Sequence, residues 1–419
     1  MTVAPKPVDL TVGLYGSPRE IAAYRQAVDN YAAAQQRVHL TLKTWPTAAA
    51  MMSDLASGTP TPDVFLAGRD DLSVLQEDKL IQPVEDVLAA RNVDLGDAYS
   101  REALEAFSSD RHLACMPYAA SPQVVYYNTD LIDFDAMETA GHDVPNPDSG
   151  RWNLEQFADA MQWAARPAAG IRSIARPADV AALAPFLYSG SGKVVDDEDA
   201  PTSLAFSDSD NQSTWDQLLP ILRGNGVALT RRQLHQHTPL QWFERGKLAM
   251  LVGDRSLVPT LRQQVGLHWD VMALPTVSSS ATLGDYSGLC MSADTEQTQA
   301  AGDLLAYLVS RPAVALVAQA GFMVPASTEV AMSDDFLQPT QRPQHAQVFV
   351  NAVRSMHVLP IPSTFLTELD RQTSGLISDL FRPGADVPRV TQQIDAASQP
   401  VLAALNAQLH PSATASPTD

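Results

Sequence analysis

The sequence predicts an α/β protein that folds as two lobes. The chain has 419 residues, which is more than one hydrophobic core usually supports. Strand-like and helix-like segments alternate along much of it, an order typical of a parallel sheet with helices on its faces. A third observation is a break inside an apolar stretch, which separates two strand-like segments without a hairpin signal between them.

The N-terminal segments show the alternation most clearly. Residues 8–16 alternate in the manner of a strand and end in a turn that includes Gly16 and Ser17. Residues 19–34 carry apolar side chains at spacings of three and four, which predicts an amphipathic helix. Residues 38–45 alternate again, and a short helix that stops at Gly58 leads to a third strand over 63–68.

The break lies in "LACMPYAASPQVVYYNTDL", residues 113–131. Small residues and two prolines separate an apolar run that ends at Met116 from a second run that begins at Val124. A tight hairpin favours Asn-Gly or a similar pair, and none occurs here. We therefore expect the break to join two separate sheets.

The pattern continues after the break. Asn153 followed by Gln156 predicts a capping box for a helix over 154–166. Further strands are predicted over 245–253 and 268–275, and further helices over 215–227 and 298–321. From about Asp334 the chain is predicted to be mostly helical, with proline-rich breaks.

The composition excludes two classes of partner. Asp and Glu number 48 against 28 Lys and Arg, so the formal net charge is −20 and the pI is about 4.7. Such a surface repels nucleic acid and anionic membranes.

No apolar run reaches the ~18 residues that span a bilayer. We expect that any export signal has been removed, and that residues 411–419, rich in Pro, Ser, Thr and Ala, form a disordered tail.

The motifs do not assemble an active site. "LYSGSGKVV" departs from the phosphate-binding loop, and "GDYSG" has Tyr286 where a nucleophile elbow requires serine. His235 and His237 lack the spacing of a zinc site. The pair Asp70 and Asp71 fits an exposed turn at least as well as acid–base chemistry. We therefore expect a protein that is not an enzyme and that uses no cofactor and no metal.

The two cysteines, Cys115 and Cys290, leave two alternatives open. Their separation excludes a CxxC zinc or redox motif. They are either two buried free thiols or one long-range disulfide, and a disulfide would imply an oxidising compartment.

Loops at the carboxyl ends of the predicted strands are the candidate ligand-binding region, because open α/β sheets bind ligands there. These loops combine small residues with Asp, Arg, Ser and Tyr, which hydrogen-bond hydroxyl groups. They cover residues 16–17, 68–70, 121–123, 253–256 and 285–288. Each nearby aromatic is either a core side chain or a face for the C–H surface of a polyol; the candidates are Tyr118, Trp152, Tyr188, Trp242, Tyr286 and Phe322.

Five parts of the chain resemble the extracellular solute-binding proteins of ABC importers. In chain order they are "LASGTPTPDVFLAG", "LACMPYAASPQVVYYNTDL", "WNLEQFADAM", "FERGKLAMLVGD" with "HWDVMALP", and "AGDLLAYLVSRPAVALVAQAGFMVPA". The matches follow the family's order over residues 8–330. The resemblance is to family 1, the carbohydrate-binding, maltose-binding-protein-like branch, and within it to the UspC-like group of actinobacterial proteins that bind amino sugars.

This resemblance implies a type II periplasmic-binding-protein fold: two lobes, three crossover segments, and a ligand cleft between the lobes that closes on the ligand. Lobe 1 is then expected over 1–120 plus 275–324, and lobe 2 over 121–274 plus 325–410. The sequence "PYAASP" becomes the first crossover. Cys115 would end one lobe-1 strand and Cys290 would lie in the returning one, so the resemblance favours a disulfide between them.

The family's ligand loops, carried over to this chain and joined with the aromatic candidates, give the expected ligand-binding residues. They are Gly16, Ser17, Arg69, Asp70, Tyr118, Ser121, Tyr188, Trp242, Asp254, Arg255, Tyr286, Ser287, Gly288 and Phe322. Ser121 stands where relatives often have an acidic residue, and Asp254 with Arg255 where an aromatic is frequent. These departures argue against long maltodextrins.

We expect the ligand to be a sugar, and the Asp-rich loops favour an amino sugar. The alternative is a glycerophosphodiester bound through Arg69 or Arg255. A weaker alternative is a sugar-acting α/β enzyme with Asp70 or Asp254 as general acid or base. The resemblance also implies a monomer that delivers its ligand to a membrane permease. We expect it outside the cytoplasm, as a cell-surface lipoprotein whose lipid anchor is absent from this sequence.

Overall fold

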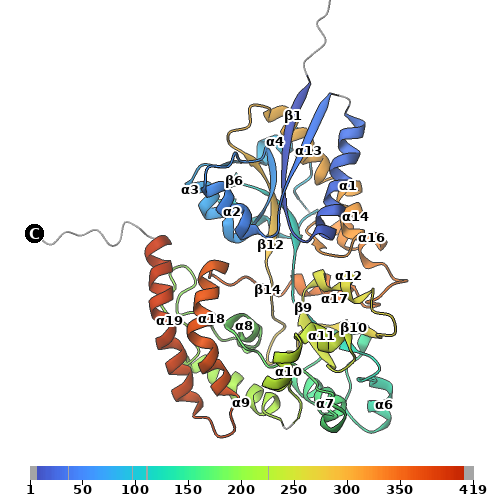
Figure 1. Cartoon of the computed structure of the whole chain (residues 1–419), viewed down its shortest axis with the longest axis vertical. Coiled ribbons are helices and arrows are strands. Elements are labelled where there is room, and N and C mark those ends of the chain that lie inside the picture. The colour runs from blue at the N-terminus through green and yellow to red at the C-terminus, as the bar shows by residue number, and fades with distance from the viewer. Residues whose placement is uncertain (1–6, 36, 97, 110–111, 225, 410–419) are drawn as a thin grey trace, which may run out of the picture. The chain divides into compact units, whose positions relative to one another are not determined.

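The computed structural model describes residues 7–409 except 36, 97, 110–111 and 225 (Figure 1). The tail predicted over 411–419 lies outside the described residues. The chain divides into two compact units, which confirms the predicted two-lobed α/β class. Unit 1 comprises Met1–Ser121, Arg255–Pro259 and Asp285–Gln338, and unit 2 comprises Pro122–Asp254, Thr260–Gly284 and Pro339–Asp419.

Unit 1 is built on one mixed sheet in the order β13-β7-β12-β3-β1-β2, with β4 paired to β12. Its strands are β1 (Val8–Tyr15), β2 (Val38–Trp45), β3 (Val64–Gly68), β4 (Ile81–Gln82), β7 (Met116–Ala120), β12 (Tyr286–Ser292) and β13 (Val324–Pro325). The first three strands are parallel to one another, as predicted. The strand β12 is antiparallel to both β3 and β7, and it closes the sheet from a distant part of the chain.

Helices cover this sheet and bury its apolar side chains. They are α1 (Pro18–Ala34), α2 (Ala48–Ala56), α3 (Leu72–Glu77), α4 (Glu85–Ala89), α5 (Arg101–Ala106), α13 (Thr298–Leu308), α14 (Arg311–Gln319), α15 (Thr328–Ala331) and α16 (Asp334–Leu337), with the 3-10 turns η1 (Arg69–Asp71) and η4 (Arg255–Leu257) and the small hairpin β5 (Ser108–Ser109) and β6 (His112–Leu113). Ser17 caps α1 by accepting a hydrogen bond from the backbone N–H of Glu20. The buried stripe of α1 is the one that the sequence predicts: Ile21, Tyr24, Val28 and Tyr31.

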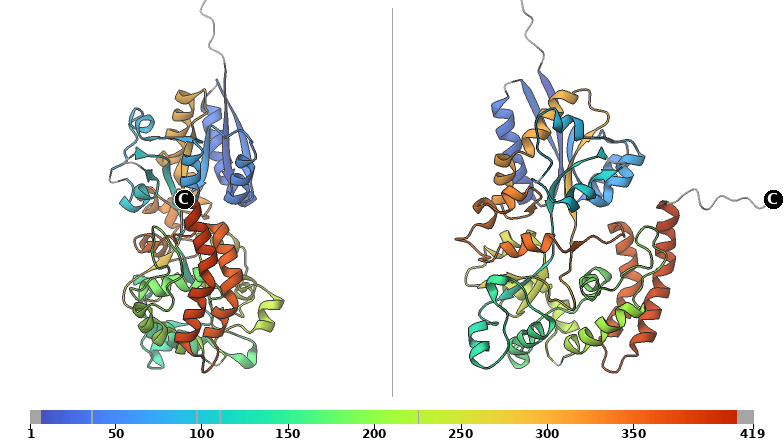
Figure 2. Two further views of the ribbon diagram at one scale, coloured as in Figure 1. Left: turned by 90° about the vertical axis from the view of Figure 1, so that its left-hand side faces the viewer. Right: turned by 180° about the vertical axis from the view of Figure 1, so that it is seen from behind.

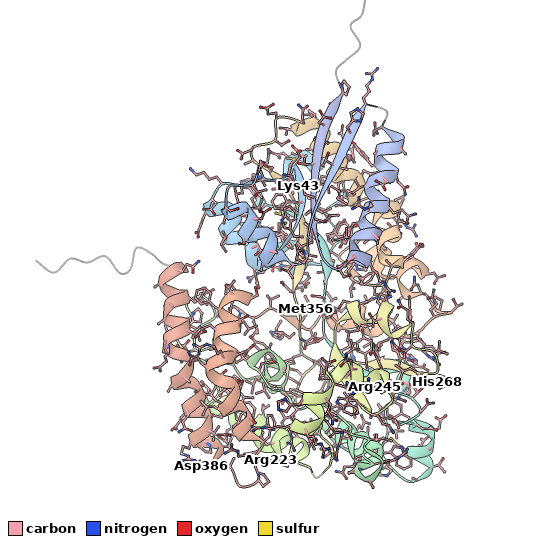
Figure 3. All side chains as sticks on the ribbon, viewed as in Figure 1. Lys43, Arg223, Arg245, His268, Met356 and Asp386 are labelled. Carbon is pink, nitrogen blue, oxygen red and sulfur yellow. A yellow bond between two sulfur atoms is a disulfide. The ribbon has the colours of Figure 1, made fainter. Side chains whose placement is uncertain are left out.

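Unit 2 is mainly helical around a small antiparallel sheet. The sheet has the order β10-β8-β9, and a two-stranded parallel pair joins β11 to β14. Its strands are β8 (Val124–Asn128), β9 (Met250–Gly253), β10 (Trp269–Met272), β11 (Thr282–Leu283) and β14 (Met356–His357). The first residue of β14, Met356, is labelled in Figure 3. The predicted strand over 245–253 is correct only from Met250, because a turn with positive φ at Gly246 follows the preceding helix.

The helices of unit 2 are α6 (Phe134–Thr139), α7 (Leu154–Ala164), α8 (Val180–Ser189), α9 (Ser209–Leu222), α10 (Arg231–Gln236), α11 (Pro239–Glu244), α17 (Gln347–Val353), α18 (Ser363–Leu380) and α19 (Val387–Leu409); α12 (Val258–Leu261) crosses the unit boundary, and η2 (Pro147–Ser149) and η3 (Pro167–Ala169) are 3-10 turns. The capping box of α7 forms between Asn153 and Gln156 as predicted. Figure 2 shows α18 and α19 side by side. One continuous apolar core joins α6, α7, α8, α9, α18 and α19 to β8.

The break in "PYAASP" separates two sheets, as predicted. β7 belongs to the large sheet of unit 1 and β8 to the small sheet of unit 2. Most of the break is itself paired, because Met116–Ala120 is a buried strand that pairs with β12 and β13. The second connecting segment runs alongside: Ser121 N–H donates to the Asp285 carbonyl at 2.9 Å, and Gln123 N–H donates to the Leu283 carbonyl at 2.9 Å.

Three of the unit boundaries fall after Ser121, Gly284 and Gln338, and the short segment Arg255–Pro259 also belongs to unit 1, whereas the predicted lobe boundaries fall after residues 120, 274 and 324. Residues 275–284 stay with unit 2 because Ser278 donates a backbone hydrogen bond to Ser189 and β11 pairs with β14. Residues 325–338 stay with unit 1 because α15 and α16 pack against α14. Tertiary contacts made on either side of each crossover therefore set these boundaries.

Cys115 and Cys290 form a disulfide, which decides between the two alternatives that the sequence leaves open. The bond joins the start of β7 to β12 across neighbouring antiparallel strands, next to the paired residues Met116 and Leu289. Both sulfur-bearing residues are fully buried. The disulfide therefore staples together two parts of the unit-1 sheet that are 175 residues apart in sequence.

No single helix in the described part of the chain has the length and apolar composition to cross a membrane. Only α13 and α14 together meet those criteria, and they bend by 56° at the break between them. Their buried residues include Leu304, Leu305, Val314 and Val317, and α13 contacts β1, β3 and β12. This pair belongs to the core of unit 1.

An Asp–His–Asp contact in unit 2 fixes the segment that precedes α17. His345 Nδ1 lies 2.7 Å from Asp270 Oδ2, and its Nε2 lies 3.3 Å from Asp148 Oδ1. The backbone N–H of His345 also donates to Asp270 Oδ1 at 3.1 Å. Burial by itself would lower the pKa of His345, but the hydrogen bonds and charges of Asp270 and Asp148 outweigh it and raise the pKa.

We predict that His345→Gln lowers the free energy of unfolding by about 1–2 kcal/mol at pH 5.5. Because the folded-state pKa of His345 is raised, its stabilisation is complete below the unfolded pKa of about 6.5 and is lost as pH rises through the folded value. Urea titrations at pH 5.5 and 8.5 measure this, with exposed His112→Gln as the control. An equal effect of His345→Gln at both pH values would contradict the prediction.

Candidate functional site

The sheet of unit 1 brings distant polar residues to one edge. β1 and β3 are parallel, so Tyr15 and Gly68 end their strands at the same edge. β12 runs the opposite way, and its register pairs Ser287 with Gly68. The residue before β12, Asp285, therefore lies beside the turn that follows β3, which carries Asp70 and Asp71.

We call Asp70, Asp71 and Asp285 the acidic cluster. Their proximity shows at Gly68, where an added Cβ would lie 3.2 Å from Asp71 Oδ2 and 3.9 Å from Asp285 Oδ2. The backbone N–H of Gly68 donates to Asp71 Oδ2 at 3.2 Å. The backbone N–H of Tyr286 donates to Asp285 Oδ1 at 2.7 Å. Backbone donors thus orient two of the three carboxylates.

The electrostatics of the acidic cluster favour the protonated acids. Burial, followed by the charge of Asp70, raises the pKa of Asp285 to about 7. The hydrogen bond from the Tyr286 N–H and the charge of Arg69 act in the opposite sense and lower this pKa. Burial also raises the pKa of Asp71 to about 6 and raises the pKa of Asp70. Arg69 is the nearby cation, with a guanidinium nitrogen 3.9 Å from Asp70 Oδ1 and a side chain that is 43% exposed. A further positive charge near these groups would favour the ionised form of all three carboxylates.

The residues that follow β1 belong to the same edge. Gly16 has a φ of +140°, a backbone conformation that favours glycine, and the Glu20 carboxyl group lies so close that an added Cβ would be 2.6 Å from its Oε2. Burial raises the pKa of Tyr15 well above its usual value, and Asp71 and Asp285 raise it further. The structure therefore places the predicted residues Gly16 and Ser17 near the acidic cluster.

Sequence reasoning missed Tyr15 and Glu20 as members of this edge. It included Asp285 in the candidate loop 285–288 but not among the expected ligand-binding residues, and it weighed Asp71 only together with Asp70. The last residue of a strand at the ligand-binding edge is the signal that would have found Tyr15. No local sequence signal shows that Asp285 lies beside Asp70 and Asp71, because this proximity depends on the pairing of β12 with β3.

Predicted residues at the start of β12 have mainly structural contacts. Ser121 Oγ donates to the Asp285 carbonyl and accepts from the Asp285 N–H, at 3.1 and 3.2 Å. Gly288 packs against the ring of Phe107, where a Cβ would approach to 2.9 Å.

Tyr286 is 4% exposed, and its hydroxyl has no hydrogen-bond partner among the described residues. Burial, followed by the charges of Glu102 and Asp285, raises the pKa of Tyr286 to about 12. Ser287 forms the ladder pair with Gly68.

The structure does not bring Tyr118 or Arg255 to the acidic cluster. Tyr118 is 3% exposed and its ring contacts Tyr24 at 5.6 Å. Arg255 is fully buried, its guanidinium lies 3.9 Å from the centre of the Phe336 ring, and it donates to the Phe336 carbonyl. Phe322 is half-buried in the turn before β13. Tyr118 and Arg255 pack as core side chains of unit 1.

The remaining predicted residues lie in unit 2. Tyr188 stacks on His357 with ring centroids 4.2 Å apart and planes 6° from parallel. The indole N–H of Trp242 donates to the Gln233 carbonyl at 2.9 Å. The Asp254 carbonyl accepts a hydrogen bond from the Tyr126 hydroxyl. Trp152, weighed as an aromatic face, is 2% exposed and its indole N–H donates to the Ala273 carbonyl, so it is a core side chain.

No group of three or more His, Cys, Asp or Glu residues suited to a metal ion occurs among the residues that the structure describes. The arrangement at the edge of unit 1 instead offers acceptors. Partly exposed carboxylates that backbone N–H groups orient can accept hydrogen bonds from hydroxyl and ammonium groups.

Comparison with protein families gives one clear match. The family model described as "Bacterial extracellular solute-binding protein" matches residues 26–344 of the 419. No curated protein matches the chain.

Comparison with solved structures places the fold among type II sugar-binding proteins, as predicted. The sugar-binding protein MalE from Xanthomonas citri aligns with a TM-score of 0.76 at 16% identity, covering 95% of this chain and 98% of that one. The ABC substrate-binding protein Lmo0181 from Listeria monocytogenes, solved with cycloalternan, gives 0.73 at 15% identity, covering 97% and 99%. UspC of M. tuberculosis gives 0.71 at 14% identity, covering 94% and 100%.

Proposed function

The chain belongs to the family of bacterial extracellular solute-binding proteins, and on that premise we propose that it captures a sugar for an ABC importer, with an amino sugar as the preferred ligand. The observation that carries the proposal is the acidic cluster at the carboxyl edge of the unit-1 sheet. Hydroxyl groups of a sugar supply hydrogen-bond donors to these carboxylates. An ammonium group supplies a positive charge that favours their ionised form.

Structural neighbours support the sugar part of this proposal. Lmo0181 was solved with cycloalternan, and GacH of Streptomyces glaucescens, whose TM-score is 0.72 at 15% identity over 97% of this chain and 100% of that one, was solved with acarbose. We propose by extension that unit 1 and unit 2 close on the ligand, that a membrane permease then receives it, and that the protein is a monomeric, lipid-anchored cell-surface component. The proposal includes no catalytic step.

The glycerophosphodiester alternative has less support. It relies on Arg69 or Arg255 to meet a phosphate, and Arg255 is buried against Phe336. Arg69 then remains as one partly exposed cation beside three carboxylates. A phosphate placed there would face more negative charge than positive.

A thermal-shift screen with three matched monosaccharides tests the proposal. We expect glucosamine to raise the melting temperature more than glucose or N-acetylglucosamine, because only its amine carries a charge, and a ligand that binds the folded state alone raises stability with its concentration. Equal shifts for the three sugars would support a sugar ligand and contradict the preference for an amino sugar. A shift with glycerophosphodiesters alone would favour the alternative, and no shift with any sugar would contradict the carbohydrate assignment.

A further inference from the structure

Unit 2 contains a small cavity that the proposed sugar site does not use. Its volume is about 90 Å³, and its polar lining residues are Ser149, Arg151, Ser280, Thr282, Asn351, Arg354 and Ser355. Sugar-sized ligand pockets typically enclose roughly 300–1,000 Å³. The cavity therefore suits a few water molecules or one small ion rather than a sugar.

Charge makes this cavity unusual in the molecule. The chain has a formal net charge of −20, yet both charged residues that line the cavity are arginines. Neither Arg151 nor Arg354 has a carboxylate within 4 Å among the described residues. Asp148, which precedes the loop of Arg151, is instead directed at His345, 3.3 Å from its Nε2. Two arginines that line one cavity offer positive charge to a bound anion.

Close contacts connect the loop of Arg151 to neighbouring elements of unit 2. Gly150 has a φ of +64°, and a Cβ there would lie 2.4 Å from Val348 Cγ2, so the loop before Arg151 touches α17 directly. The Gly150 carbonyl accepts a hydrogen bond from the Ala273 N–H at 2.8 Å, which ties the same loop to the end of β10. Arg354 follows α17 at its C-terminus, where the helix dipole favours a cation. These contacts connect the loop of Arg151 to α17, the helix that ends at Arg354.

We propose that this cavity, which we call the arginine pocket, binds a small free oxyanion of the phosphate or sulfate type. Guanidinium groups donate paired N–H bonds that match the oxygens of a tetrahedral oxyanion. Ser280 and the side-chain amide of Asn351 add neutral donors from the lining. Every lining residue belongs to unit 2, so the bound ion stabilises that unit and links the loop of Arg151 to the segment that leads into β14.

Titration calorimetry with inorganic phosphate at pH 7.5, at constant ionic strength set with chloride, tests the proposal. We expect saturable one-site binding to the full chain. Arg151→Gln and Arg354→Gln should each weaken it at least about tenfold, since each removes a charge-assisted donor pair. Arg245→Gln is the matched control, because Arg245 is an exposed arginine of the same unit that follows α11, labelled in Figure 3.

A second measurement separates loss of the site from loss of the fold. Both arginines are exposed, so we expect melting temperatures of the two variants in chloride alone to match the parent protein, while phosphate raises only that of the parent and of Arg245→Gln. Unchanged phosphate affinity in Arg151→Gln and Arg354→Gln would show an adventitious ion only and would overturn the proposal. Absence of saturable binding to the parent protein would also overturn it.

Discussion

Removing the disulfide should cost about 3–5 kcal/mol of stability in the double variant Cys115→Ala/Cys290→Ala. The bond closes a loop of 175 residues in sequence separation. In the chain-entropy account, a cross-link over so long a loop strongly restricts the unfolded chain. It also joins β7 to β12, the strand that returns to unit 1 after most of unit 2. Urea unfolding of oxidised and reduced protein measures this loss.

The effect should be confined to one unit, which provides an internal check. Both cysteines belong to unit 1, so hydrogen exchange should accelerate in peptides from β7 and β12 and stay unchanged in α18 and α19. A reducing agent should shift the parent protein to the behaviour of the double variant and leave the double variant unaffected. Identical denaturation midpoints for oxidised and reduced protein would refute a stabilising role.

Asp285→Asn should change both the pH dependence of stability and the affinity for amines. The pKa of Asp285 is raised to about 7 and that of Asp71 to about 6, chiefly by burial. An acid whose folded-state pKa is raised stabilises the fold below its unfolded pKa, about 3.9, and loses that contribution as pH rises through the folded value. The parent protein should therefore lose stability between about pH 4 and pH 7. Asn at position 285 still accepts the Tyr286 N–H bond, so the variant should be about 1–2 kcal/mol more stable than the parent at pH 8.

The affinity for an ammonium ligand should rise with pH, whereas the stability of the parent protein falls. In the parent protein, an ammonium ligand should bind more tightly as pH rises from 5 to 7, because the acidic cluster ionises over that range. Asp285→Asn should weaken glucosamine binding about tenfold or more at pH 7 and flatten its pH dependence. Exposed Asp78→Asn, in the same unit, is the control. A pH-independent affinity for glucosamine in the parent protein would exclude the acidic cluster as the amine site.

Local sequence signals predicted most of the secondary structure. The N-cap at Ser17 and the capping box of Asn153 and Gln156 both form, because these hydrogen bonds join residues only three apart. The stripe of α1 is buried where the 3.6-residue period places it. The missing hairpin signal in "PYAASP" correctly indicated a passage between sheets. Boundaries were less accurate, since strands such as Met116–Ala120 depend on partners elsewhere in the chain.

The candidate site could be predicted only in part. Arg69, Asp70, Gly16 and Ser17 follow directly on their strands, so a rule about strand ends was enough to place them. Arg255 was expected in the same region and is instead buried over Phe336, since the sequence does not show which aromatic lies above a guanidinium. The arginine pocket has no sequence signal, because its two arginines are far apart in the chain. Arg151 lies between β8 and β9 in the sequence, and Arg354 lies after β10.

By itself, then, the sequence determined the α/β class, the two-part division of the chain and the acidic character of the strand-end loops. These features depend on periodicity, composition and contacts between near neighbours in the chain. Only the tertiary structure decided that Asp285 joins Asp70 and Asp71 and that Cys115 meets Cys290. Both outcomes rest on the antiparallel insertion of β12 between β3 and β7. Long-range strand pairing of this kind is selected by the packing of the whole unit, which no local stretch of residues specifies.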